Sequence, residues 1–138
     1  MNDLIIEMRA SAGLITLARP KALNALTLEM VRGLTAGLLA WQSDPRVKLV
    51  AVRGTTRKPA DAADALPFGA FCAGGDIRFF HRAALGGDPA LEDFFTEEYR
   101  LNHLVHHYPK PVVAMMDGIV MGGGMGVAQG ASTRIVTE

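Results

Sequence analysis

The run of glycines near the carboxyl end of the sequence constrains the fold most. Residues 117–126 are Asp-Gly-Ile-Val-Met-Gly-Gly-Gly-Met-Gly, and they follow an apolar stretch, 111–116, that predicts a buried strand. Glycine inside a regular element costs roughly 0.5–1 kcal/mol relative to alanine, so four glycines in five positions indicate a close approach to the backbone. Residues 125–131 are compatible with a helix. We therefore expect a strand-to-helix turn, whose first helical N–H groups lack intrahelical partners and attract negatively charged oxygen.

The spacing of these glycines excludes two common nucleotide-binding motifs. The last glycine of a dinucleotide fingerprint would fall on Val127 or Gln129. The phosphate loop of nucleoside triphosphatases ends in Gly-Lys-Ser/Thr, which the sequence lacks. Two interpretations stay open. The glycines either serve only tight packing of a helix on a sheet, or they form half of an oxyanion hole, which needs a second N–H donor elsewhere.

Composition and charge limit the class of protein and its partners. The 138 residues fit one domain, and 49% hydrophobic residues allow a substantial core. Fourteen basic and fourteen acidic side chains balance, so we expect neither nucleic acid nor a membrane as a partner. Cys72 is the single cysteine and the sequence shows no signal peptide. Both features indicate a reducing compartment, for which we expect the cytoplasm.

Hydrophobic periodicity predicts an α/β fold with crossover connections. Strands are expected at 4–9 and 14–19 around a turn at 11–13, and a buried strand with both faces covered at 47–53. Thr27 is the expected N-cap of an amphipathic helix that ends before Ser43. Residues 54–67 are expected to form an exposed loop, and 68–73 and 132–137 two further strands. Two helices are expected at 77–84 and 88–107, the second capped by Asp88.

A second glycine turn follows the strand expected at 68–73. It consists of Gly74, Gly75 and Asp76, and a helix begins directly after it. Asp76 is a good N-cap, so this turn has a purely structural explanation. Its N–H at Gly75 is also a candidate for the second donor of an oxyanion hole, and two converging N–H groups are what polarising a thioester carbonyl requires.

Four motifs in this order resemble the enoyl-CoA hydratase/isomerase (crotonase) superfamily. They are Arg-Pro-Lys-Ala-Leu-Asn-Ala-Leu at 19–26, Phe-Cys-Ala-Gly-Gly-Asp-Ile-Arg at 71–78, Lys-Pro-Val-Val-Ala at 110–114 and the glycine run at 117–126. The resemblance implies a crotonase-like spiral of ββα units, truncated, with residues 1–138 forming the N-terminal part of the domain. It also implies an acyl-CoA substrate, no separate cofactor, and an oxyanion hole built from the N–H groups of Gly75 and Gly123.

The resemblance further implies a set of substrate-binding positions: Lys21, Ala22, Leu23, Ala73, Asp76 and Gly122. The first three would hold the CoA moiety, and the backbone of Ala73 would approach the adenine. Lys21 is otherwise an ordinary solvated charge. Arg57 and Lys58 are candidates for contact with the CoA phosphates, although exposed basic side chains are commonly only solvated.

The activity within the superfamily depends on the carboxylates. Hydratases carry a catalytic glutamate at the position matched by Gly126, so this sequence departs from the two-carboxylate pattern of water addition. The motifs are most similar to those of the 3-hydroxyisobutyryl-CoA hydrolases, which cleave a thioester in valine breakdown. In those enzymes the catalytic acids would fall beyond Glu138, so this chain alone is expected to be inactive. A hydratase or isomerase and a non-catalytic acyl-CoA-binding fragment are the alternatives.

Other residues attract weaker functional interpretations. His103, His106 and His107 share one expected helix, but they lack the order of a zinc-protease motif, and we expect no metal site. Cys72 is more typical of a small buried apolar residue than of a reactive thiol. The phenylalanines at 79, 80, 94 and 95 are expected in the core or in an acyl pocket. Since half a domain leaves strand edges uncovered, we expect self-association or a homo-oligomer.

Overall fold

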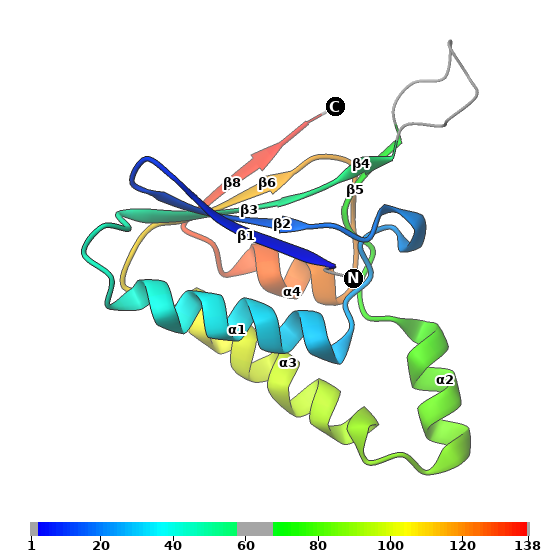
Figure 1. Ribbon diagram of the computed structural model, residues 1–138. Helices are drawn as coiled ribbons and strands as arrows, with labels where there is room; N and C mark the ends of the chain where they lie inside the picture. Colours follow the sequence, from blue (N-terminus) through cyan, green and yellow to red (C-terminus); the bar gives the residue numbers. More distant parts are fainter. Residues whose placement is uncertain (1–2, 58–67, 138) are drawn as a thin grey trace.

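A computed structural model describes residues 3–57 and 68–137, and it confirms the α/β class. Three helices lie beneath a twisted sheet, and a fourth projects beside it (Figure 1). In chain order the elements are β1 (Leu4–Arg9), β2 (Ala12–Leu17), a 3₁₀ turn (Pro20–Ala22), α1 (Leu28–Gln42), β3 (Leu49–Gly54), β4 (Thr56–Arg57), β5 (Phe68–Cys72), α2 (Ile77–Gly86), α3 (Ala90–His106), β6 (Val112–Met116), β7 (Ile119–Val120), α4 (Gly123–Gln129) and β8 (Thr133–Val136).

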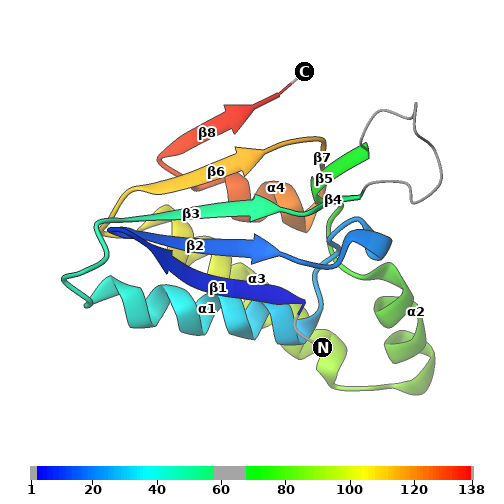
Figure 2. The ribbon, with the colours of Figure 1, turned by 45° about the horizontal axis from the view of Figure 1, so that its top comes forward.

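The main sheet has five strands in the order β1-β2-β3-β6-β8. β1 pairs antiparallel with β2, and each of the other neighbouring pairs is parallel. A second sheet of three short strands, β4-β5-β7, stands at the end of the main sheet (Figure 2). In chain order, strands precede helical structure three times: β1 and β2 before α1, β3 to β5 before α2, and β6 and β7 before α4. This succession is consistent with the repeated ββα order that the resemblance implied.

One face of the main sheet carries the core. α1 packs beneath it through a stripe of buried residues at helical spacing: Met30, Val31, Leu34, Leu38 and Trp41. The Trp41 ring lies directly on β2 at Gly13, where a Cβ would come within 2.6 Å of the ring. Lys110 ties the carboxyl end of α1 to the start of β6, because its ammonium donates to the carbonyl oxygens of Trp41 and Asp44. A cation is favourable at that end of a helix.

The opposite face of the sheet corrects one expectation. β3 was expected to be buried on both faces, but only Val50 and Val52, which face the helices, are fully buried. Leu49, Ala51 and Arg53 on the other face are half-buried, because no described helix covers that face (Figure 2). A run of β-branched residues signals a strand but does not say how many layers cover it.

Several boundaries also differ from the sequence expectation. The hairpin turns at Ala10 and Ser11, with Ala10 at φ 53°, so Ala12 and Gly13 belong to β2 rather than to the turn. Thr56–Arg57 and Ile119–Val120 were assigned to loops, yet both pair in the small sheet. Two-residue strands carry no periodicity by which a sequence pattern reveals them. Residues 58–67 of the expected loop lie outside the described residues.

The caps of α1 and α2 agree with the sequence expectation. Thr27 Oγ1 accepts a hydrogen bond of 3.2 Å from Met30 N at the start of α1. Asp76 caps α2 by accepting from the N–H groups of Arg78 and Phe79. The start of α3 differs, because Pro89 rather than Asp88 is its N-cap, and Asp88 accepts from Ala90 N at 2.9 Å from one residue earlier. The side chains of Thr27 and Asp76 thus fix where α1 and α2 begin.

Candidate functional site

The two glycine turns, 45 or more residues apart in sequence, lie against each other. Gly75 N is 3.5 Å from the point where a Cβ on Gly123 would stand, and Gly123 N is 3.6 Å from the corresponding point on Gly74. Pairing of β5 with β7 brings them together, because each turn follows one of these strands. Gly74 at φ 115° and Gly122 at φ 50° both occupy conformations that favour glycine. The sequence expectation that the two turns meet is consistent with this geometry.

Both proposed donors lack a protein acceptor. Within the described residues, neither the Gly75 N–H nor the Gly123 N–H donates a hydrogen bond to the protein. Gly123 is the first residue of α4, so its N–H is one of the groups that the helix cannot pair internally. The next N–H group, at Gly124, is occupied by Met121 O at 2.8 Å. Two adjacent unpaired donors can bind one oxygen that is gaining negative charge.

A cavity of about 370 Å³ opens beside Gly75. Six of the eight predicted site residues line it: Lys21, Ala22, Leu23, Ala73, Gly75 and Asp76. Gly122 and Gly123 do not line it, but both lie against Gly74, the neighbour of Gly75 in the chain. Arg78 also lines this cavity and was not predicted. In the described part of the chain, neither Lys21 nor Arg78 has an ion-pair partner, so the cavity offers two cationic side chains to an anionic ligand.

Asp76 occupies the junction of the cavity and α2. Its carboxylate caps the helix with one oxygen and pairs with Arg19 Nη2 at 2.8 Å with the other. Burial raises the pKa of Asp76, but the Arg19 hydrogen bond and the capping N–H groups outweigh it, and its pKa lies below the usual value. Asp76 therefore serves as a structural anion here, and its proposed contact with substrate rests on the cavity lining alone.

Glu98, which the sequence analysis missed, lies at the centre of the site. It projects from α3 with 7% of its surface exposed, and a Cβ on Gly123 would overlap its Oε1. No donor among the described residues bonds to its carboxyl group, and burial raises its pKa. The signal was present in the sequence, because Glu98 falls on the apolar side of α3, in line with Phe94, Leu101 and Val105. A carboxyl at a core position of an amphipathic helix, without an evident partner, indicates a functional group.

The aromatic cluster closes the other side of the donors. Phe80 and Phe94 lie under Gly75, where a Cβ would come within 3.3 Å of Phe94 and overlap Phe80. Their rings are 4.9 Å apart, and Phe95, 39% exposed, lies 5.0 Å from Phe80. The expectation of a core aromatic is confirmed for Phe94, which is fully buried. A side chain at position 75 would require the Phe80 ring to move.

Packing explains the remaining glycines of α4. Gly124 lies on β5, where a Cβ would stand 2.8 Å from Cys72 Cβ and would overlap Cys72 O. Gly126 lies on Asn102, and Gly130 on the backbone of His106. The packing interpretation of the glycine run is therefore supported at positions 124, 126 and 130. The oxyanion interpretation, which concerns the turn at 122 and 123, stays a prediction.

Cys72 is buried under α4, with 1% of its surface exposed. Burial raises the pKa of the thiol to about 11, and the nearby Glu98 acts in the same direction. A thiol of this kind is uncharged and poorly nucleophilic at neutral pH. The expectation of a small buried residue is confirmed.

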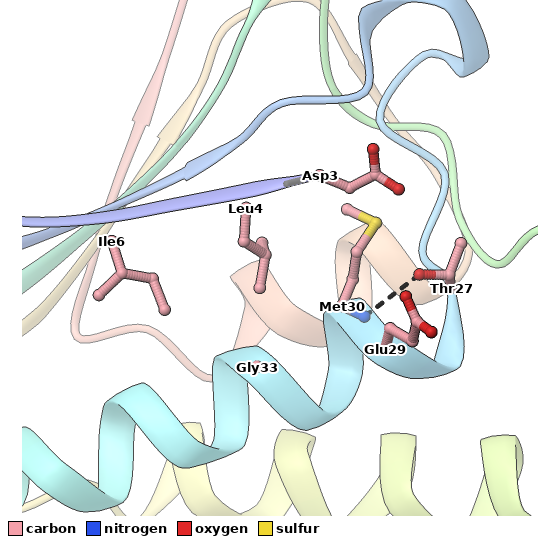
Figure 3. A pocket seen from close by; sticks show the side chains of 7 residues that line it. All are labelled: Asp3, Leu4, Ile6, Thr27, Glu29, Met30 and Gly33. Atoms are coloured by element: carbon pink, nitrogen blue, oxygen red, sulfur yellow. Dashed lines mark hydrogen bonds between the residues drawn. The ribbon is translucent and has the colours of Figure 1, made fainter. Parts of the chain in front are cut away.

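A second hollow, of about 410 Å³, lies between β1 and α1 and shares no lining residue with the cavity beside Gly75. Leu4, Ile6 and Met30 face into it, and the carboxylates of Asp3 and Glu29 stand at one end (Figure 3). The Thr27 hydroxyl at its rim is already used as a helix cap. Carboxylates repel phosphates, so this hollow suits an acyl-CoA less well than the cavity beside Gly75.

The remaining candidates are the histidines of α3 and the basic residues Arg57 and Lys58. Among the residues that the structure describes, no three His, Cys, Asp or Glu side chains are grouped so as to hold a metal ion. The His103 and His107 rings stack at 4.1 Å on the exposed end of α3. Lys58 lies outside the described residues and only the backbone of Arg57 is described, so their contact with phosphates stays a prediction. No described helix has the length and apolar character needed to cross a membrane.

Comparison with known proteins adds three findings. The family model for enoyl-CoA hydratase/isomerase matches residues 12–138. The chain is 46% identical over 127 residues to a 3-hydroxyisobutyryl-CoA hydrolase, mitochondrial, of Xenopus laevis, covering 92% of this chain and 30% of that protein. It is 40% identical over 136 residues to the protein of the same name in Gallus gallus, covering 99% and 32%.

A solved structure agrees with the fold. An enoyl-CoA hydratase from Rhodobacter sphaeroides 2.4.1 superposes with a TM-score of 0.85 at 41% identity, over 99% of this chain and 38% of that one. The chain thus spans about a third of the length of the curated relatives it matches. Their names place those relatives in mitochondria, whereas the sequence suggested the cytoplasm, and that expectation stays a prediction.

Proposed function

Because the chain belongs to the enoyl-CoA hydratase/isomerase family, we propose that it binds an acyl-CoA and polarises the thioester carbonyl between two backbone N–H groups. The donors are those of Gly75 and Gly123. The observation that carries the proposal is that these two N–H groups belong to turns in contact, have no acceptor among the described residues, and include Gly75, which lines a cavity with cationic side chains.

The cavity suits the CoA moiety by charge and by shape. Lys21 and Arg78 offer positive charge to phosphates, and the backbone of Ala73 borders the same space. Ala22 and Leu23 give it an apolar wall against which a purine ring can lie. The phosphates therefore meet the charged rim, while the thioester end of the ligand extends past Gly75 towards Gly123.

Polarisation of the carbonyl is the chemical step that the backbone provides. As a nucleophile or base attacks the acyl group, the thioester oxygen gains negative charge, and fixed N–H donors lower the energy of that state. Each such donor is typically worth about 2.7–4 kcal/mol in the transition state. Since both donors are held by glycines with no room for a side chain, the oxygen can approach the backbone closely.

Glu98 supplies a carboxyl group beside the same oxygen. Its raised pKa favours the protonated form more than an exposed glutamate would, and a protonated carboxyl can donate a hydrogen bond to the substrate. When ionised, the same group can accept a proton. We assign Glu98 to the site on its position against Gly123 and on the absence of a structural partner among the described residues.

Thioester hydrolysis is the activity that we favour. The relatives named 3-hydroxyisobutyryl-CoA hydrolase support it, and so does Gly126, which leaves α4 without the carboxylate expected of a hydratase. Enoyl-CoA hydration or isomerisation is the second candidate, supported by the superposition on an enoyl-CoA hydratase. The third is binding of acyl-CoA without turnover. The acyl-CoA is the substrate, and no separate cofactor is proposed.

Calorimetric titration of the chain with isobutyryl-CoA, free CoA and isobutyrate tests the binding proposal. We expect isobutyryl-CoA and CoA to bind and isobutyrate alone not to bind. For a longer protein that carries this sequence together with the catalytic acids, release of free thiol from 3-hydroxyisobutyryl-CoA, compared with formation of hydroxy product from crotonyl-CoA, then separates the hydrolase from the hydratase. Absence of binding to either CoA compound refutes the proposal.

A further inference from the structure

The peptide groups on both sides of Gly75 are fixed by a single partner, the backbone of Leu26. Leu26 N donates to Gly74 O at 2.7 Å, and Asp76 N donates to Leu26 O at 2.9 Å. Gly74 C=O and Gly75 N–H belong to the same planar peptide and point in opposite directions. The bond to Gly74 O therefore sets the direction in which the proposed donor N–H points. A shift of Leu26 would turn that donor.

The position of Leu26 in turn depends on Arg19. The Arg19 guanidinium donates through Nη1 to Ala25 O at 3.1 Å, directly before Leu26, and pairs through Nη2 with Asp76 Oδ2 at 2.8 Å. One planar group thus joins the segment before Leu26 to the turn that contains Gly75. Its side chain is 26% exposed and lines the cavity, so the guanidinium lies between the ligand space and the donor.

The backbone of Arg19 is fixed as well. Arg19 N donates to Asn24 Oδ1 at 2.8 Å, and Asn24 is fully buried and bonded through Nδ2 to Ala70 O at 2.8 Å. The start of the segment is therefore attached to β5, the strand that leads into the Gly75 turn. The guanidinium then binds the other end of the segment, at Ala25 O, directly before Leu26.

We propose that Arg19 is a positioning residue that orients the Gly75 N–H by clamping the 19–26 segment to Asp76. This inference rests on the proposed function. Lysine cannot replace arginine here, because an ammonium is a point charge, whereas the planar guanidinium reaches Ala25 O and the Asp76 carboxylate at once. Loss of the guanidinium leaves the cavity and the cationic side chains of Lys21 and Arg78 in place, but it allows the Gly75 N–H to turn.

The test separates ligand binding from carbonyl polarisation. The full 138-residue chain is titrated with CoA, which lacks an acyl carbonyl, and with isobutyryl-CoA carrying a ¹³C-labelled carbonyl. The infrared stretch of the bound carbonyl reports its polarisation, since hydrogen bonds to the oxygen lower the frequency. Arg19→Lys is compared with Arg32→Lys, which alters an exposed pair with Glu97 on α1 and α3 at a distance from the cavity.

We expect Arg19→Lys to bind CoA within threefold of the wild-type chain and to lose at least half of the carbonyl shift. Arg32→Lys should retain both. A carbonyl shift in Arg19→Lys equal to that of the wild type overturns the inference, and so does a loss of CoA affinity with an unchanged shift. A wild-type chain that binds isobutyryl-CoA without any carbonyl shift refutes the proposed function itself.

A second variant covers the case in which Arg19→Lys does not fold, which far-UV circular dichroism would reveal. Asp76→Asn keeps an oxygen for the α2 cap but removes the charge that binds the guanidinium. We expect the same loss of carbonyl shift, and a double variant that loses no more than either single variant because both act through one contact. An Asp76→Asn chain with the full carbonyl shift overturns the inference.

Discussion

Substitution of Gly124 by alanine tests the contact that holds α4 on β5. The new Cβ would overlap Cys72 O and stand 2.8 Å from Cys72 Cβ. Ordinary carbon contacts lie near 3.5 Å, so α4 must recede by roughly 0.7 Å. Cys72 O also accepts a hydrogen bond of 3.1 Å from Met121 N, which limits how far the strand can yield. Overpacking of this kind costs about 1–3 kcal/mol, and the gain in helix propensity offsets up to about 1 kcal/mol.

Gly126→Ala provides a matched control on the same helix. Its Cβ would stand 2.7 Å from Asn102 Nδ2, which is the end of a side chain rather than backbone. Rotation of Asn102 sacrifices no hydrogen bond of Oδ1, because that buried oxygen has no partner among the described residues. We expect Gly126→Ala to stay within about 1 kcal/mol of the wild type, whereas Gly124→Ala loses about 1–2 kcal/mol.

Urea unfolding followed by the fluorescence of Trp41 measures both changes, since that ring lies in the core against β2. Equal stabilities for the two variants, or a Gly124→Ala chain as stable as the wild type, refute the argument that backbone contact at β5 requires glycine. The comparison also bears on the site, because any movement of α4 displaces the Gly123 N–H.

Further predictions concern Glu98, Asn24, Cys72 and Ile135. The pKa of Glu98 is raised in the folded state, so the stability that it contributes is full below its ordinary value of 4.5 and is lost as the pH rises through the folded value. Across that window the unfolding free energy of Glu98→Gln, measured in urea, should rise relative to the wild type by at most about 1.4 kcal/mol per pH unit. A difference that does not change with pH contradicts this prediction. Asn24→Ala leaves Arg19 N and Ala70 O without their hydrogen bonds to the Asn24 side chain and should lower the unfolding free energy by about 2–4 kcal/mol. A loss below about 1 kcal/mol argues against a stabilising role for these hydrogen bonds. Iodoacetamide at pH 8 should leave the Cys72 thiol, with a pKa of about 11, unmodified in the folded chain and alkylate it in urea, as mass spectrometry will show. β8 is exposed along its length, so light scattering should detect self-association that Ile135→Lys weakens; a monodisperse wild-type monomer contradicts that expectation.

Local signals in the sequence predicted the parts of the site that depend on local structure. Thr27 and Asp76 cap helices where hydroxyl and carboxylate side chains precede apolar periodicity, and Gly74 and Gly122 mark turns whose positive φ favours glycine. Convergence of the two turns was expected from chemistry, since an oxyanion hole needs two donors. The pairing of β5 with β7 that produces it was not predicted, because a two-residue strand has no pattern to read.

The sequence analysis missed features that depend on how the elements pack together. The position of Glu98 on the apolar side of α3 could be read from the sequence, but only the structure shows that it lies against Gly123. Arg78 becomes part of the cavity only because Asp76 starts α2 at its rim. The open face of the main sheet likewise could not be inferred, since burial on one face and burial on both faces produce similar apolar runs.

A structure of the chain bound to an acyl-CoA thioester tests the central claim most directly. The account predicts that the thioester oxygen lies about 2.7–3.1 Å from both Gly75 N and Gly123 N, with the CoA moiety in the cavity lined by Lys21 and Arg78. A bound thioester whose oxygen contacts neither nitrogen, or a CoA moiety seated elsewhere on the molecule, would contradict it.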